Sequence, residues 1–160
     1  MKRWRWWDMS RTLDYLESRD DIDMKHAGFI GTSFGATFPL PYLAMEHRFR
    51  AAVLISGGLP QLELPPEIDP LNFVSRITLP VLMINGRFDY VSPKETSQHP
   101  LADRLGTPAA DRRYCVFEFG HGDLPRRDVV RETLAWMDRY LGQTDPQAPR
   151  AVGLLPPCTN

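Results

Sequence analysis

The stretch that decides the fold is AGFIGTSFGA, residues 27–36, in which an apolar run leads directly into a serine held between two glycines. This spacing is typical of a sharp turn from a β-strand into a helix. Gly31 and Gly35 are expected to leave room there, because glycine has no Cβ. Such a turn exposes the Ser33 hydroxyl and points the Phe34 amide, at a helix N-terminus, toward any developing negative charge.

Helical and strand patterns alternate along the rest of the chain. Four apolar runs predict strands at 26–33, 50–58, 79–89 and 113–122. Helices are expected at 3–18, 34–49, 92–106 and 126–142, although prolines interrupt the second and third of these ranges. The first helix carries one apolar face of Trp6, Met9, Leu13 and Leu16, and the last carries a stripe of Val129, Leu134, Met137 and Leu141 and is closed by Gly142.

The predicted strands are continuous apolar runs, which is typical of strands that are buried on both faces. Together with the alternation of strands and helices, this indicates an α/β fold with a parallel sheet and right-handed crossovers. Ligands in such sheets collect beyond the carboxyl ends of the strands. Three reactive groups follow strands at that edge: Ser33, then Asp89 in NGRFDYVSP, then His121 in FGHGDLP.

Each of these residues also has a plainer interpretation. An aspartate in a turn often only bonds its own backbone, and most histidines are ordinary surface or core residues. His26 precedes its strand, and His47 and His99 fall in predicted helices, so only His121 is expected at the right end of the sheet. Asp123 is a rival acid, but it is too close in sequence to orient the imidazole of His121 easily. The coincidence of nucleophile, acid and base in this order is the signal.

Composition narrows the class of protein. The 160 residues carry a net charge of −1, which disfavours a nucleic-acid partner, and they hold no apolar run long enough to span a membrane. No metal-ligand spacing and no nucleotide-binding glycine pattern is present, so no metal and no cofactor is expected. Cys115 and Cys158 form no disulfide framework, which favours a reducing, cytoplasmic location. We expect one domain over 1–142 and a proline-rich tail over 143–160.

From about Arg11 to Gly142 the chain resembles the C-terminal half of the α/β-hydrolase superfamily, in particular the dienelactone-hydrolase and prolyl-oligopeptidase-like branch. The resemblance rests on LDYLESRDDID, GFIGTSFGA, PVLMINGRFDYVSPKETSQHPLADRLGTP and FGHGDLPRRDVVRETLAWMDRYLG. It implies a truncated α/β-hydrolase-like fold of about four parallel strands flanked by helices. It also implies that Ser33 is the nucleophile, Asp89 the triad acid and His121 the general base. Dienelactone hydrolases use cysteine at the turn, so serine points to an ordinary ester.

The resemblance implies a serine esterase that needs no cofactor and hydrolyses short-chain acyl esters through an acyl-enzyme. A peptidase or thioesterase could use the same three residues. The proline-rich loop 57–70 lies where this superfamily inserts substrate-binding pieces, and it is expected to place Leu59 and Leu62 near the site. Its small size favours short acyl groups.

The family pattern also includes about four further strands, one of which pairs beside the first strand here. The loop after that strand normally gives the second oxyanion-hole amide. We expect a homo-oligomer that covers the bare edge. The alternatives are a minimal hydrolase, with Arg87 or the SGGL backbone as a local donor, and a truncated, non-catalytic remnant that serves as an interaction module. The tryptophans of MKRWRWW are expected in the core or at a subunit contact rather than on a membrane.

Overall fold

The computed structural model describes residues 4–142, with side chains described from Asp8 onward. Four strands form one parallel sheet: β1 (Gly28–Thr32), β2 (Ala51–Ile55), β3 (Val81–Gly86) and β4 (Arg112–Phe117). Their order in the sheet is their order in the chain, β1-β2-β3-β4, so β1 and β4 are its two edges. All four predicted strands are confirmed. β2 and β3 are almost completely buried because helices cover both faces of the sheet, as their continuous apolar sequences require.

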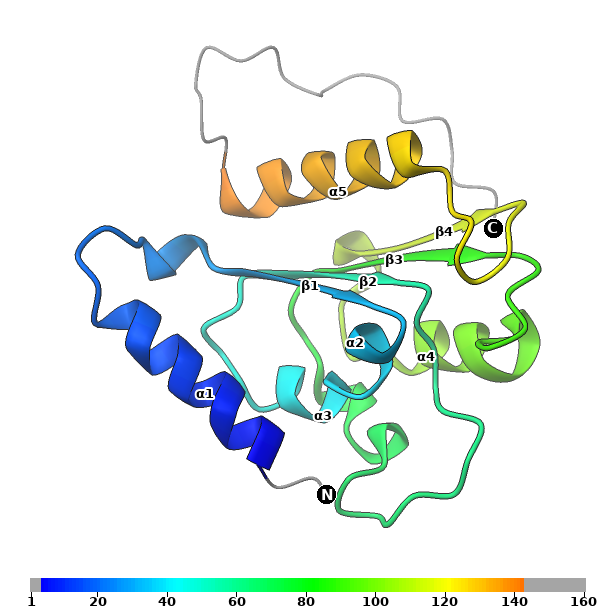
Figure 1. Ribbon diagram of the computed structural model, residues 1–160, viewed down its shortest axis with the longest axis horizontal. Helices are drawn as coiled ribbons and strands as arrows, with labels where there is room; N and C mark the ends of the chain where they lie inside the picture. The colour runs from blue at the N-terminus through cyan, green and yellow to red at the C-terminus, as the bar shows by residue number, and fades with distance from the viewer. Residues whose placement is uncertain (1–3, 143–160) are drawn as a thin grey trace.

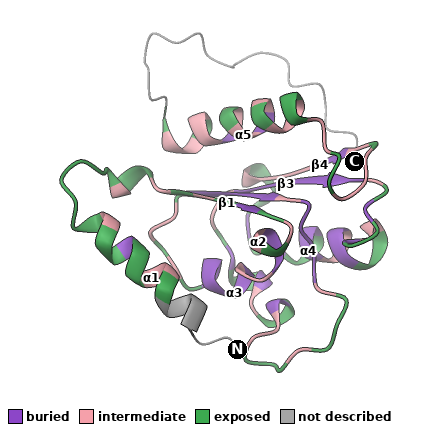
Figure 2. Ribbon diagram, viewed as in Figure 1, coloured by how far each residue is buried: buried purple, intermediate pink, exposed green. Residues whose placement is uncertain are grey.

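One long helix, α5 (Arg126–Leu141), covers one face of the sheet, and the remaining helices lie on the other (Figure 1). The second layer contains α1 (Trp4–Glu17), α2 (Phe34–Thr37), α3 (Leu40–Leu43) and α4 (His99–Arg104). Short 3-10 turns lie at η1 (Met24–His26), η2 (Pro70–Asn72), η3 (Val74–Arg76) and η5 (Ala109–Asp111). Figure 2 shows the sheet buried between these layers, with the outer surfaces of α1 and α5 exposed.

The helix expected over 34–49 is interrupted in the structure. Prolines explain the break, because they supply no backbone N–H for a continuous ladder. Pro39 precedes α3 and Pro41 lies in its first turn, so α2 and α3 are separate single turns. The segment after Leu43 is irregular, and the placement of His47 on a helix is therefore wrong.

The helix expected over 92–106 begins as a π-helical turn, η4 (Lys94–Gln98), and continues as α4. Pro100 lies in the first turn of α4, directly after η4, and supplies no backbone N–H to the turn before it. The π-helical turn is a local widening of the kind that often accompanies functional sites.

The last helix is confirmed, but its buried face differs from the prediction. Trp136 is 4% exposed and packs over the sheet with Val129, Met137 and Leu141. Leu134 is 56% exposed, so it does not belong to the buried stripe. Gly142 ends the helix with a positive φ of 82°, as the sequence predicts.

Cys115 is fully buried in β4 and is disulfide-bonded, while Cys158 lies outside the described residues. The cysteines, which were expected to form no disulfide framework, therefore no longer support a reducing, cytoplasmic location. Within residues 4–142, no helix is both long and apolar enough to cross a membrane. The proposed tail 143–160 and the side chains of Trp4, Trp6 and Trp7 lie outside what the structure describes.

Candidate active site

Ser33 occupies a strained turn between β1 and α2. Its φ of 54° and ψ of −113° are rare for a residue with a side chain, and its N–H donates to the carbonyl of Ile55 at 2.8 Å. A Cβ built on Gly31 would overlap the carbonyl oxygen of Gly35, so glycine is required at position 31. The steric reason expected for Gly35 is wrong, because a Cβ there meets nothing within 4 Å. The turn itself is the one that the glycine-flanked serine predicts.

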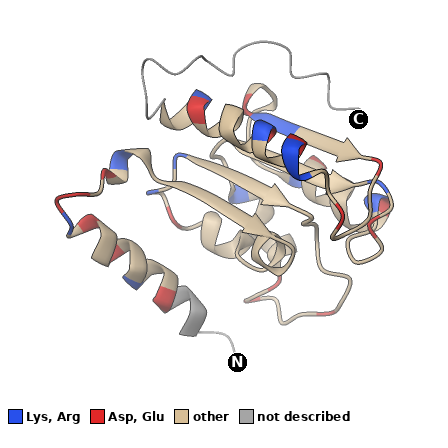
Figure 3. Cartoon of the chain, turned by 45° about the horizontal axis from the view of Figure 1, so that its top comes forward, with Lys and Arg blue, Asp and Glu red and all other residues tan. Residues whose placement is uncertain are grey.

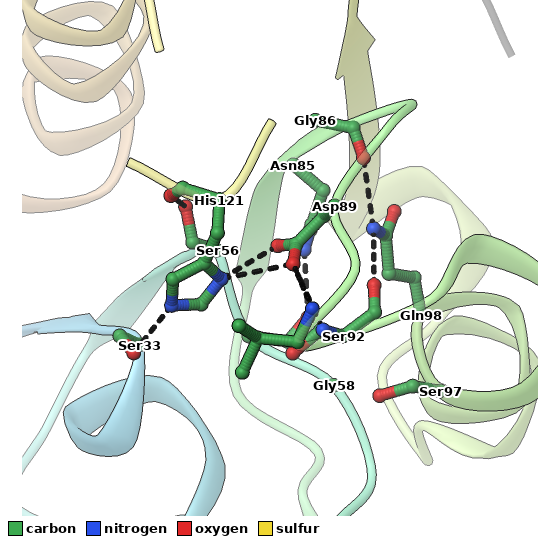
Figure 4. Close-up of polar contacts among 12 residues, drawn as sticks. Ser33, Ser56, Gly58, Asn85, Gly86, Asp89, Ser92, Ser97, Gln98 and His121 are labelled. Carbon is green, nitrogen blue, oxygen red and sulfur yellow. Dashed lines mark hydrogen bonds and ion pairs between the residues drawn. The ribbon is translucent and has the colours of Figure 1, made fainter. Parts of the chain in front are cut away.

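Ser33, His121 and Asp89 form one hydrogen-bonded chain (Figure 4). Ser33 Oγ lies 2.7 Å from His121 Nε2, and His121 Nδ1 lies 2.9 and 2.8 Å from the two carboxylate oxygens of Asp89. An ionised carboxylate only accepts, so Nδ1 carries the proton. Nε2 of the neutral ring is then an acceptor for the Ser33 hydroxyl. The structure thus brings together the three residues that the strand ends single out.

The carboxylate of Asp89 is buried, with only 3% of the residue exposed. Its Oδ1 accepts the N–H groups of Val91 and Ser92 at 2.9 and 2.8 Å, in addition to the imidazole. These bonds compensate the loss of water around a buried charge. They also fix the orientation in which the carboxylate accepts the hydrogen bond from His121.

A buried glutamine holds the loop that carries Asp89, and sequence reasoning missed it. The Nε2 group of Gln98 donates to the carbonyls of Gly86 and Ser92 at 2.9 and 2.7 Å, and its Oε1 accepts the Tyr114 hydroxyl at 2.6 Å. Gln98 is fully buried, and burial also raises the pKa of Tyr114 above its ordinary value. No local signal marked it, because Gln98 ends the polar run Lys94–Gln98.

Ser56, which follows β2, anchors the loop that carries His121. Sequence reasoning missed this residue too. Ser56 Oγ donates to the backbone carbonyl of His121 at 2.9 Å, and Ser56 is 1% exposed with a positive φ of 51°. Asn85 donates from Nδ2 to the carbonyl of Gly57 at 2.7 Å and so fixes the loop that follows Ser56. A Cβ on Gly86 would overlap the carbonyl oxygens of Phe119 and Gly120, so only glycine at position 86 lets the loop before His121 pack this closely.

The competing groups lie elsewhere. His26 of η1 bonds Asp23 at 2.7 Å, and His99 of α4 lies 3.3 Å from Glu95 of η4. Asp123 is exposed and makes none of the bonds that orient His121.

The candidate oxyanion donors have different surroundings. Phe34 is the first residue of α2, directly after Ser33. The guanidinium of Arg87 is ion-paired with Glu118. In SGGL, the Gly58 N–H donates to Thr37 Oγ1 at 3.4 Å and the Leu59 N–H to the Ser97 carbonyl at 3.1 Å. These contacts leave Arg87, Gly58 and Leu59 engaged away from Ser33.

A cavity of about 250 Å³ opens beside Ser33 and His121. None of the described residues that line it is charged; its walls include Thr37, Phe38, Leu59, Gln61, Leu62 and Val91. Leu59 is almost buried and Leu62 is 56% exposed, so the first forms part of the floor and the second part of the rim. Gln61 ties this wall to η4 by donating to the Thr96 carbonyl at 2.9 Å.

No protein-family model and no curated protein matches the sequence. Solved structures do match the fold. A zinc-bound cold-adapted esterase from an Arctic intertidal metagenomic library superposes with a TM-score of 0.70 at 22% identity, over 84% of this chain and 56% of the esterase. An acetyl xylan esterase from Paenibacillus sp. R4 superposes with a TM-score of 0.68 at 19% identity, over 85% of this chain and 52% of the esterase. An acylaminoacyl peptidase superposes with a TM-score of 0.66 at 18% identity, over 84% of this chain and 27% of the peptidase.

The described chain spans about half the length of the esterases that it matches. At this level of identity the match concerns the fold. Four parallel strands with flanking helices correspond to a part of these enzymes. The chain therefore has a partial α/β-hydrolase-like fold, structurally matched to esterases and other hydrolases.

Proposed function

We propose that the protein is a serine esterase that hydrolyses short-chain carboxylic esters through an acyl-enzyme. The observation that carries the proposal is the hydrogen-bonded chain from Ser33 Oγ through the His121 imidazole to the buried Asp89 carboxylate. A serine hydroxyl is a weak nucleophile until a base takes its proton, and the 2.7 Å contact with Nε2 supplies that base.

In the acylation step, Ser33 Oγ attacks the ester carbonyl carbon while His121 Nε2 takes the hydroxyl proton. The tetrahedral intermediate collapses, the bond to the alkoxy oxygen breaks, and the imidazolium returns the proton to the departing alcohol. Asp89 holds the Nδ1–H tautomer and stabilises the imidazolium. In deacylation, water takes the place of the alcohol and His121 serves as base again, which releases the acid and restores Ser33.

The Phe34 amide is proposed as an oxyanion donor, because it follows the nucleophile at the start of α2. Removing one of two donors costs roughly 100- to 1000-fold in turnover in a comparable site. Arg87 and the amides of Gly58 and Leu59 are engaged elsewhere, so none of these three is proposed as the second donor.

The neutral, partly apolar cavity supports an uncharged acyl group, with Leu59 and Leu62 as the acyl-contacting side chains. Its volume of about 250 Å³ suits a chain of a few carbons better than a long lipid chain. The same three residues could serve an amide or a thioester, so both bond types belong in the substrate panel.

The test compares p-nitrophenyl acetate, butyrate and octanoate, a p-nitroanilide and a thioester with wild-type protein and Ser33→Ala. We expect hydrolysis of the two shorter esters, lower rates on octanoate and the other bonds, and no turnover by Ser33→Ala. A fluorophosphonate gives a readout that does not depend on turnover: intact mass should rise by one adduct in the wild type only. Equal behaviour of both proteins, each folded by circular dichroism, would leave the non-catalytic alternative, an interaction module.

A further inference from the structure

Among the strands of residues 4–142, β1 is an edge strand with one side open. The Ser33 N–H bonds the Ile55 carbonyl, and the Ala27 carbonyl accepts the Arg50 N–H, so the odd-numbered residues of this segment point their backbone groups toward β2. Backbone direction alternates along a strand. The N–H and C=O groups that point away from β2, into the open edge, therefore belong to Gly28, Ile30 and Thr32.

The two edges of the sheet differ in protection. β4 begins with Arg112 and Arg113, and charged side chains on an edge strand discourage pairing with another strand. β1 has the sequence GFIGT, with no charge and no proline. Figure 3 shows the basic residues on β4 and none on β1. Of the two edges, β1 is the one suited to pairing.

Within the described part of the chain, the flank of α5 on the β1 side is also uncovered. A Cβ built on Gly28 would meet Leu141 and Met137, which places this flank of α5 above β1, whereas Glu132 on the opposite flank pairs with Arg113 of β4 at 3.1 Å. Val130 and Leu134 share the Met137–Leu141 flank by helical spacing and are 48% and 56% exposed.

Ile30 belongs to the same uncovered surface. Side chains two apart on a strand share a face, so Ile30 lies on the α5 face with Gly28, and it is 55% exposed. An apolar surface of Ile30, Val130 and Leu134 thus adjoins an unpaired strand edge. Exposed apolar surface of this kind beside an open edge marks an interaction site.

We propose that this surface, defined by the open edge of β1 with Ile30, Val130 and Leu134, binds a second copy of this chain as a symmetric dimer. β1 pairs antiparallel with its counterpart across a two-fold axis that passes beside Ile30, perpendicular to the sheet. This register sets Ile30 opposite Ile30 and Gly28 opposite Thr32, so every edge-facing residue finds a hydrogen-bonded partner. Any shifted register leaves at least one of the three unpaired.

The surface is complementary to itself, which is why a second copy is the proposed occupant. The same two-fold axis keeps both α5 helices on one side of the joined sheet and turns their Val130–Leu134 flanks toward each other. The apolar Ile30 side chains meet at the axis itself. The pairing also lays the partner strand beside the Ser33 turn. None of this depends on the proposed esterase activity.

The first test measures mass in solution by size exclusion with light scattering at micromolar concentration. We expect twice the 18.3 kDa of the chain for wild type. Ile30→Lys places a charge in the edge and Leu134→Glu places one on the α5 flank, and both should give a monomer. Leu71→Lys is the matched control, because Leu71 is 46% exposed in η2 and outside this surface, and it should stay dimeric. A monomeric wild type overturns the proposal, as do two surface variants that stay dimeric.

The second test reads the register by oxidative crosslinking. Directly opposed residues in a hydrogen-bonded antiparallel pair have Cα atoms about 5.5 Å apart, within disulfide reach. Ile30→Cys should therefore form a covalent dimer on mild oxidation. Thr32→Cys, two residues along the same edge, should not, since its symmetry mate lies about 13 Å away along the strands. Equal crosslinking of both variants, or of neither beyond wild type, would refute the proposed pairing.

Discussion

His121 and Ser33 meet across the full width of the sheet. The two residues are 88 positions apart and follow opposite edge strands, β4 and β1, yet His121 Nε2 lies 2.7 Å from Ser33 Oγ. The loop after β4 crosses the carboxyl ends of β3 and β2 to make this contact. Backbone bonds from Arg87 and Phe88 to the carbonyls of Phe117 and Phe119, at 2.7 and 2.9 Å, guide the crossing. The loops of all four strands therefore contribute to one site.

Asp89→Asn should nearly abolish turnover while leaving the fold intact. An asparagine can present its amide to His121 Nδ1, which favours the tautomer with the proton on Nε2 and deprives Ser33 of its base. In a serine protease triad the same change lowers kcat by about 10⁴. Steady-state hydrolysis of p-nitrophenyl butyrate measures the effect. Asp123→Asn, an exposed position outside the hydrogen-bonded chain, should keep wild-type turnover; a similar loss in both variants would count against the assigned roles.

Gly31→Ala and Gly35→Ala should separate the two glycines that flank Ser33. The Gly31 Cβ would overlap the Gly35 carbonyl, so we expect a loss of about 1–3 kcal/mol in the free energy of unfolding and a slower fluorophosphonate reaction. A Cβ on Gly35 meets nothing within 4 Å, so Gly35→Ala should be neutral or slightly stabilising. Urea unfolding monitored by fluorescence gives both values. Equal destabilisation would show that the turn needs both glycines.

Glu46→Gln tests a pH-dependent contribution to stability. Hydrogen bonds from the Arg48 side chain lower the pKa of Glu46, and Arg48 also bonds Asp14 at 2.8 Å, which ties α1 to the fold. A lowered carboxyl pKa adds stability at pH values above the ordinary carboxyl pKa, and this is lost as pH falls through the folded-state pKa. We expect Glu46→Gln to cost about 1 kcal/mol at pH 7 and to converge with wild type in acid.

Thermal unfolding at a series of pH values from 7 down to 3 tests this dependence. The control is Glu118→Gln, because the Glu118 side chain is 64% exposed and its pair with Arg87 should contribute little at any pH. A difference between Glu46→Gln and wild type that persists at low pH would contradict the ion-pair explanation.

The sequence predicts the strands and the three reactive groups because both follow from local patterns. Apolar runs mark the strands, and polar residues at their carboxyl ends mark the site. Ser56 and Gln98 escaped notice because their roles arise from contacts made by distant loops, which no local pattern encodes. Leu134 was misplaced for a similar reason: helical periodicity gives the apolar flank of α5, but not whether another element covers it.

Ser56 should be a positioning residue for His121. Its hydroxyl holds the His121 carbonyl at 2.9 Å, and the residue adopts a positive φ of 51° while fully enclosed. A strained conformation of this kind persists only where the surrounding contacts impose it. The hydrogen bond therefore fixes the position of the His121 backbone, and with it the distance from His121 Nε2 to Ser33 Oγ.

Two variants separate positioning from stability. Ser56→Ala loses the hydrogen bond and keeps the strain, so it should cost about 1 kcal/mol in the free energy of unfolding. Ser56→Gly loses the same bond but relieves the strain of about 1 kcal/mol, so it should be more stable than Ser56→Ala. If Ser56 positions His121, kcat on p-nitrophenyl butyrate falls roughly tenfold in both variants with KM unchanged, equivalent to about 1.4 kcal/mol of the barrier. Turnover that follows stability instead, with Ser56→Gly near wild type, would leave Ser56 a purely structural residue.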